Sequence, residues 1–235
     1  MNRGRFACAV WLVGGLCVPG AVWGQSAASS STRAVDVLPA TIPIFPLQEV
    51  LLFPNTSLSL HLFEPRYRAM AADVLKGDRI IGMVLLRPGY EADYEGRPPV
   101  YAIGCAGTIT DARELPDGRY LIALRGLVKF RIGGEDQSRP YRLAHVEAMP
   151  EPPSDEERVA LRQWRLQLEA LLAPAVSSRS NPAQRSLSDE DLVNTLAQQL
   201  DVEPLARQDL LERRGLLARS EGLMDLLKIK AAPQR

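Results

Sequence analysis

The sequence has few of the residues from which disulfide frameworks and metal sites are built. It contains three cysteines and two histidines in 235 residues, and Cys8 and Cys17 both lie near the start. Cys105 is the remaining thiol, and one thiol cannot form an internal disulfide. A zinc site needs three or four ligands, and the histidines, His61 and His145, have no neighbouring cysteine in the sequence. We therefore expect no disulfide framework, no metal and no cofactor.

Motifs of enzyme catalysis are also missing from the printed sequence. It has no Gly-x-x-x-x-Gly-Lys-Ser/Thr phosphate loop, no Gly-x-Ser-x-Gly elbow and no His-Glu-x-x-His pair. Neighbouring carboxylates such as Glu156 and Glu157 stand where a helix is predicted to begin, a position that favours acids without any catalytic role. The sequence thus predicts no catalytic residue and a protein that is not an enzyme. An enzyme with an unrecognised site stays open as an alternative.

An excess of charge of one sign is absent as well. Lysine and arginine number 28 and aspartate and glutamate 28, so the formal net charge is zero. A domain that binds nucleic acid presents a basic face to the phosphates. Basic residues do gather between positions 113 and 131, and we interpret them as the solvated face of a strand: Arg113, Arg119, Arg125, Lys129 and Arg131. No nucleic-acid partner is expected.

Residues 1–24 differ in composition from the rest. Arg3 and Arg5 precede an apolar run, Phe6 to Val18, and the small residues Val22 and Gly24 fit a cleavage site. The run is too short for a bilayer, which needs about 20 residues of helix. We expect a cleaved signal peptide, no stable membrane span after its removal, and an exported protein, periplasmic or secreted. An uncleaved N-terminal anchor is the alternative.

The remaining chain divides by composition into a linker and two lobes. Residues 25–40 are rich in Ser and Ala and predict a flexible linker. Residues 41–150 are rich in short apolar runs and turns and predict a β-rich lobe, and 151–235 predict a lobe of helices. Pro150, Pro152 and Pro153 mark the boundary between the two lobes.

Several strands are predicted in the first lobe. Prolines in or beside Ile42–Leu47 and Glu49–Phe53 indicate edge or broken strands. Ser57–Leu62 alternates between polar and leucine residues, as a half-buried strand does. The Pro-Asp-Gly turn at 116–118 predicts a hairpin, with a bulge or bend at Gly126. Further strands are expected at 79–86, 128–132 and 141–148.

Helix ends are marked by local signals. Pro65 suits the first turn of a helix, which Gly77 is expected to end. Ser154 and Glu157 form a capping box, and Ser188 is placed to cap the next helix. A short helix is predicted from Pro204 to about Gly215, followed by a last helix that contains Leu217, Met224 and Leu227.

Residues 60–68, Leu-His-Leu-Phe-Glu-Pro-Arg-Tyr-Arg, closely resemble the signature of the Lon protease N-terminal domain, a substrate-recognition module. The resemblance spans roughly residues 41–230. It is also carried by these segments: Ile42–Leu47, Leu51–Asn55, Asp117–Tyr120, Lys129–Ile132, Tyr141–Val146 and Gln208–Glu212.

This resemblance implies an α+β fold, with a PUA-like pseudo-barrel lobe followed by a C-terminal helical bundle. It also implies a non-catalytic module that binds unfolded or extended segments of other proteins. The expected protein is a stand-alone exported member of that family, lacking the ATPase and peptidase parts. An oligomerisation or structural module is a further alternative, and the oligomeric state is left open.

The candidate site of the sequence is the junction formed by Glu64, Arg66, Tyr67 and Arg68. These residues fit a charged rim that grips a peptide backbone or terminus. They also fit a structural junction, in which Glu64 favours the helix dipole and Arg66 pairs with it. We favour the structural interpretation, because a helix start needs its backbone groups satisfied. Free sheet edges and apolar clefts between the lobes are the other places where a polypeptide is expected to bind.

Overall fold

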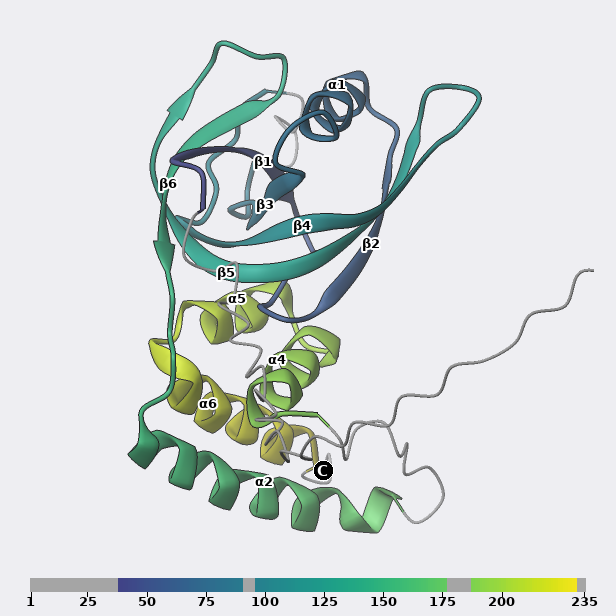
Figure 1. Cartoon of the computed structure of the whole chain (residues 1–235). Coiled ribbons are helices and arrows are strands. Elements are labelled where there is room, and N and C mark those ends of the chain that lie inside the picture. Colours follow the sequence, from purple (N-terminus) through teal and green to yellow (C-terminus); the bar gives the residue numbers. More distant parts are fainter. Residues whose placement is uncertain (1–37, 91–95, 177–186, 232–235) are drawn as a thin grey trace, which may run out of the picture. The chain divides into compact units, whose positions relative to one another are not determined.

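The computed structural model describes residues 38–90, 96–176 and 187–231 (Figure 1). The predicted signal peptide, and the predicted linker as far as residue 37, lie outside the described residues. The described residues belong to one compact unit, Ala34–Arg235.

Strands come first in this unit and helices follow. The strands are β1 (Thr41–Leu47), β2 (Ser57–Leu62), β3 (Ile80–Leu85), β4 (Ile103–Glu114), β5 (Tyr120–Asp136) and β6 (Arg142–Met149). Helix α1 (Pro65–Val74) lies between β2 and β3 in the sequence. The later helices are α2 (Asp155–Val176), α4 (Asp189–Gln199), α5 (Pro204–Glu212) and α6 (Gly215–Ala231).

The strands form one mixed, six-stranded sheet in the order β2-β5-β4-β3-β1-β6. β1 and β3 are parallel, and the other pairs are antiparallel. The long strand β5 pairs with β6 as well, from Lys129 to Asp136, so the series of pairings returns to β5. Among the described strands β2 pairs with β5 alone, and it therefore lies at the border of the sheet (Figure 1).

The prolines of β1 fit a strand that changes partner halfway. β1 pairs with β6 through Thr41–Ile44 and with β3 through Ile44–Leu47. Pro43 lies in the first half and Pro46 in the second, and each half has one partner strand. A residue without an N–H is tolerated in such a half, because its missing donor is not needed on the unpaired side.

The predicted strand at Glu49–Phe53 is wrong. Leu51, Leu52 and Phe53 are buried, but the segment is not part of the sheet. The N–H of Phe53 donates to Oε1 of Gln198 at 3.0 Å and to Oγ1 of Thr56 at 3.3 Å. The apolar side chains are buried, as they would be in a strand. The backbone N–H of Phe53, however, bonds to side chains and not to a neighbouring strand.

The predicted hairpin is confirmed. The strand that follows its turn and the strand predicted at 128–132 form one continuous strand, β5. Gly107 of β4 pairs with Gly126 and Ala106 pairs with Val128, so Leu127 is an extra residue on β5. This register shift confirms the bulge predicted at Gly126. A Cβ atom at Gly126 would lie 2.0 Å from the carbonyl oxygen of Phe53, so only glycine fits where these two backbones meet.

The two predicted helix caps that rest on serine are confirmed. Oγ of Ser154 accepts from the N–H of Glu157 at 3.2 Å, and the N–H of Ser154 donates to Oε2 of Glu157 at 2.7 Å. Oγ of Ser188 accepts from the N–H of Asp191 at 3.0 Å.

The two predicted glycine ends are wrong. The C-cap of α1 is Leu75, and the left-handed residue after it is Arg79 (φ 59°), not Gly77. The N–H of Arg79 donates to the carbonyl of Val74 at 3.2 Å. Gly215 does adopt a positive φ of 80°, but it is the first residue of α6, since α5 ends at Glu212.

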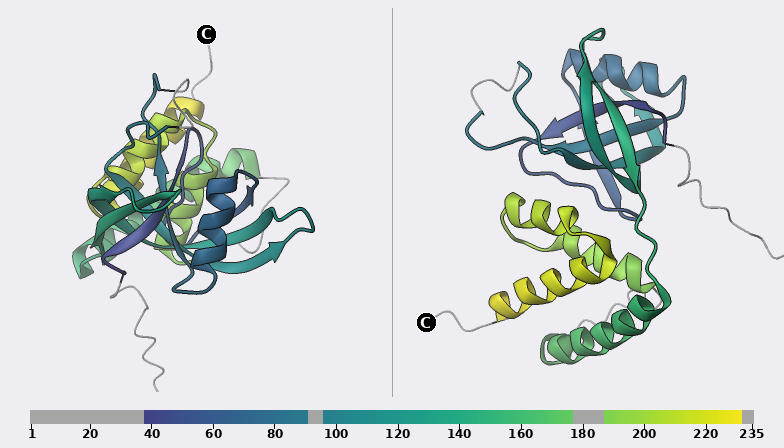
Figure 2. Two further views of the ribbon diagram at one scale, coloured as in Figure 1. Left: turned by 90° about the horizontal axis from the view of Figure 1, so that it is seen from above. Right: turned by 90° about the vertical axis from the view of Figure 1, so that its left-hand side faces the viewer.

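The helices α2, α4 and α5 each contact α6 (Figures 1 and 2). The main cluster of buried apolar side chains draws on the sheet, for example Met83 and Leu124, and on these helices, for example Trp164 and Leu223. A second cluster collects residues of the strands alone: Ile42, Ile44, Val84, Ala106, Phe130 and Ala144. The helices and the sheet are therefore held by a shared core.

Candidate functional site

The junction between β2 and α1 brings together three of the four predicted site residues, Glu64, Arg66 and Tyr67. Nε of Arg66 lies 2.9 Å from Oε2 of Glu64, and both side chains are about four-fifths buried, at 19% and 23% exposure. The guanidinium of Arg66 also lies over the ring of Tyr67, 4.7 Å from its centroid. Glu64 is the N-cap residue of α1, yet its side chain makes no capping hydrogen bond. Its carboxylate faces Arg66 instead.

Tyr67 also lies in the core, and Arg68 points elsewhere. Tyr67 is buried, and its ring centroid lies 4.3 Å from that of Phe45. Arg68 reaches the turn between β4 and β5, where a Cβ atom on Gly118 would lie 2.1 Å from one of its terminal nitrogens. The four residues thus do not converge on one opening. They tie α1 to its own start, to the core and to the hairpin.

The backbone of β2 offers hydrogen-bonding groups on its outer edge. In an antiparallel pair, alternate residues direct their N–H and C=O groups toward the partner strand. The N–H of Gly126 donates to the carbonyl of Thr56 at 2.9 Å, which places Thr56, Leu58, Leu60 and Leu62 in the set that faces β5. The other set, Ser57, Ser59 and His61, directs its backbone groups away from the sheet.

Most of this outer edge is unoccupied by other described residues. The carbonyl of Ser57 accepts from Nε2 of Gln198 at 2.9 Å. No residue of the described ranges bonds to the backbone groups of Ser59 or His61 on that side. The N–H and C=O groups of Ser59 and His61 are therefore available on this edge.

Apolar side chains flank the same edge. Phe63 is 60% exposed and Leu121 of β5 is 41% exposed. Leu121 is paired with His61, whose ring centroid lies 5.8 Å from that of Phe63. An aromatic ring and a leucine thus stand in solvent where the backbone edge is open. Such a combination suits an extended polypeptide.

A separate cavity of about 200 Å³ opens between the end of β3 and the start of α5. Leu85, Leu86 and Pro204 line it, together with Tyr90 and Leu205. The last two are about half exposed. Gln48, Arg87 and Glu203 also line it, so the cavity combines apolar and charged side chains.

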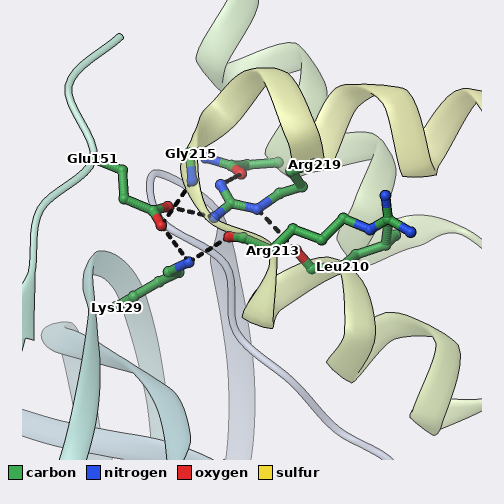
Figure 3. A network of polar contacts seen from close by, with 7 residues as sticks. Lys129, Glu151, Leu210, Arg213, Gly215 and Arg219 are labelled. Atoms are coloured by element: carbon green, nitrogen blue, oxygen red, sulfur yellow. Dashed lines mark hydrogen bonds and ion pairs between the residues drawn. The ribbon is translucent and has the colours of Figure 1, made fainter.

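A buried ionic network that the sequence did not predict joins β5, the segment after β6 and α6 (Figure 3). Nζ of Lys129 lies 2.6 Å from Oε1 of Glu151 and donates to the carbonyl of Arg213 at 2.8 Å. Nη2 of Arg219 lies 2.8 Å from the other oxygen, Oε2. The N–H of Gly215 also donates to Oε1, at 2.9 Å. The carboxylate of Glu151 thus pairs with two cations and accepts a hydrogen bond from the first residue of α6.

Lys129 was predicted to lie on a solvated strand face, and that prediction is wrong. Its side chain is 1% exposed, and burial lowers its pKa although the hydrogen bond to Glu151 opposes the shift. Burial likewise lowers the pKa of Arg219, which also donates to the carbonyl of Leu210 at 3.1 Å. The alternation of Lys129 with Val128 and Phe130 is that of any half-buried strand, so no local signal distinguished a covered lysine from a solvated one.

The thiol of Cys105 lies close to this network and is fully buried. Burial raises its pKa to about 12, against the opposing effect of the nearby Arg219. Within the described ranges no three His, Cys, Asp or Glu side chains are grouped so that they could hold a metal ion. No helix in the same ranges is both long and apolar enough to cross a bilayer.

Comparison with known proteins gives a consistent result. Residues 41–229 match the profile of the ATP-dependent protease La (LON) substrate-binding domain. Lon protease 2 of Myxococcus xanthus is 27% identical over 199 residues, which cover 82% of this chain and 24% of that protein. Lon protease 2 of Syntrophobacter fumaroxidans is 28% identical over 179 residues, covering 74% and 22%. The chain therefore matches only about a quarter of the length of these relatives.

Two solved structures have a similar fold. The N-terminal domain of the Mycobacterium avium complex Lon protease superposes with a TM-score of 0.62 at 16% identity, over 80% of this chain and 98% of that one. A Lon N-terminal domain protein from Xanthomonas campestris gives 0.52 at 21% identity, over 80% and 97%. At such identities the likeness concerns the fold alone.

Proposed function

The chain belongs to the family of the LON substrate-binding domain, and from that premise we propose that it binds extended or unfolded segments of other proteins without acting on them chemically. The observation that carries this proposal is the outer edge of β2, where the backbone groups of Ser59 and His61 are open beside the exposed side chains of Phe63 and Leu121.

Strand addition supplies a mode of binding that accepts many sequences. Backbone hydrogen bonds to Ser59 and His61 depend on the peptide groups of the bound segment and not on its side chains. Phe63 and Leu121 add a preference for apolar residues. Glu64 and Arg66 follow Phe63 directly in sequence, and we place them at the rim of this site, with Tyr67 and Arg68 as its support.

The cavity between β3 and α5 offers a second apolar contact. Tyr90 and Leu205 each leave about half of their surface in solvent. A long unfolded chain can engage this cavity and the β2 edge at once, which raises the overall affinity through effective concentration.

Three further parts of the proposal concern architecture and location. The returning series of strand pairings, with an inner cluster drawn from β1, β3, β4, β5 and β6, supports a PUA-like pseudo-barrel. We take 41–150 and 151–235 as its two lobes. Residues 1–24 support export, which fractionation of cells and mass spectrometry of the N-terminus would test: an intact leader on a cytoplasmic protein would contradict it.

Binding is tested with reduced, carboxymethylated α-lactalbumin, which cannot refold, and with the native protein as the folded control. The chain described here carries the fluorescent label. Its fluorescence anisotropy should rise when unfolded α-lactalbumin is added and should not rise with the native form. Phe63→Ser should weaken binding about tenfold, since covering the exposed part of a phenylalanine contributes about 1.5 kcal/mol.

Ile229→Ser is the matched control, because Ile229 is 70% exposed on α6 and has no part in the proposed site. Equal affinity for unfolded and folded α-lactalbumin would contradict the proposed function. An equal loss from both substitutions would contradict the proposed place of binding.

A further inference from the structure

The side chain of Gln198 lies against the first position of the β2 edge. Its Oε1 accepts from the N–H of Phe53 at 3.0 Å, and its Nε2 donates to the carbonyl of Ser57 at 2.9 Å. Oε1 also accepts from the hydroxyl of Thr56. The carboxamide thus occupies the carbonyl of Ser57 as an N–H of an added strand would, while its own oxygen is held by Phe53 and Thr56 and not by the N–H of Ser57.

The contact between Gln198 and Ser57 lies on the outer edge of β2. Ser57 belongs to the set of β2 residues whose backbone groups point away from β5, together with Ser59 and His61. Its carbonyl is the first acceptor on the outer edge, and it is taken by a residue of α4. The open edge is therefore a direct continuation of the existing interface between α4 and the loop before β2.

A cavity of about 250 Å³ adjoins this contact. Its lining includes Thr56, Ser57 and Gln198, with Thr195 and Gln199 from the same helix. Polar side chains thus line the end of the edge at Ser57, whereas Phe63 and Leu121 lie at the other end. The side chain of Gln198 occupies the Ser57 end of the edge, and the end near His61 is open.

We infer that Gln198 is an internal substitute for bound peptide: it occupies the acceptor of the first pairing position of the β2 edge, the carbonyl of Ser57, so that an extended polypeptide pairs with Ser59 and His61 and stops before Ser57. This rests on the proposed function. The segment that pairs must be extended, and proline is excluded where an N–H has to reach the carbonyl of Ser59 or His61.

Amide hydrogen exchange by NMR, with carboxymethylated α-lactalbumin as the probe, tests this inference. In the natural sequence, the probe should protect the amides of Ser59 and His61 and leave that of Ser57 unchanged. In Gln198→Ala the probe should protect Ser57 as well and bind about three- to tenfold more tightly, because one more pairing position is open.

Gln199→Ala is the control, since this neighbour lines the same cavity without contacting Ser57. Gln198→Met keeps the length of the side chain and replaces the alanine variant if its thermal unfolding shows that the fold is lost. Protection of Ser59 and His61 with an unchanged Ser57 in both variants at position 198 would overturn the role of Gln198 and leave the proposed function standing. Absence of protection at Ser59 and His61 in the natural sequence would overturn the site itself.

Discussion

Replacing Glu151 by glutamine should destabilise the fold more than any change to an exposed charge. The carboxylate of Glu151 holds Lys129 at 2.6 Å through Oε1 and Arg219 at 2.8 Å through Oε2. A glutamine has one acceptor oxygen, and its NH₂ group would face one of these two cations. Lys129 and Arg219 both lose the negative charge of Glu151, and one of them also loses its hydrogen bond to residue 151.

The magnitude follows from the burial of the two cations. Their side chains are 1% and 3% exposed, while that of Glu151 is 18% exposed. Removing one partner of a buried ion pair costs about 3–5 kcal/mol, and the partial exposure of Glu151 favours the lower end, about 3 kcal/mol. For a domain of this size each kcal/mol shifts the melting temperature by about 2–4 °C. The melting temperature should therefore fall by about 6–12 °C.

Urea unfolding and calorimetry measure the effect, with Asp209→Asn as the control. Asp209 pairs with Arg213 at 3.2 Å, but its side chain is 67% exposed, so its loss should cost less than about 1 kcal/mol. Lys129→Met should cost less than Glu151→Gln, because Glu151 keeps Arg219 and the methionine fills the space. If Glu151→Gln unfolds within 1 kcal/mol of the natural protein, the assignment of this network as the junction between sheet and helices is refuted.

Three other substitutions or treatments have expected outcomes. Gly126→Ala should lower the free energy of unfolding by about 3 kcal/mol, because its Cβ atom would lie 2.0 Å from the carbonyl of Phe53; Gly133→Ala, whose Cβ atom has 3.8 Å to the nearest atom, should be nearly neutral. Ser154→Ala should cost about 1 kcal/mol in the same unfolding assay through loss of the capping box at α2, and an unchanged stability would mean that the cap is dispensable. Cys105 should resist iodoacetamide at pH 8 until the protein is unfolded, since burial raises the pKa of its thiol to about 12 and leaves almost no thiolate; rapid labelling of the folded protein would contradict this.

Local signals predicted the elements whose determinants lie within a few residues. The alternation of Ser57–Leu62 identified β2 with its bounds, and Ser154 with Glu157 identified the start of α2. The pairing of Glu64 with Arg66 belongs to the same class, since a single residue, Pro65, separates them in the chain. The cap and the ion pair have a sequence neighbour as their partner, and the alternation that marks β2 lies within the strand itself.

The failures concern partners that are distant in sequence. Alternation correctly places Lys129 on the face of β5 opposite Phe130, but it cannot reveal that Glu151 and the residues around Arg213 cover that face. The segment Glu49–Phe53 looked like a strand because it is apolar, whereas its backbone partner is Gln198, far along the chain. The open groups of Ser59 and His61 could not be predicted either, since they depend on the order of the strands.

Amide exchange along β2, with and without carboxymethylated α-lactalbumin, tests strand addition most directly. We expect the amides of Ser59 and His61 to become protected when the unfolded protein binds, while those of Leu58 and Leu60, already bonded to β5, change little. Binding of the unfolded protein with no added protection at Ser59 and His61 would contradict strand addition.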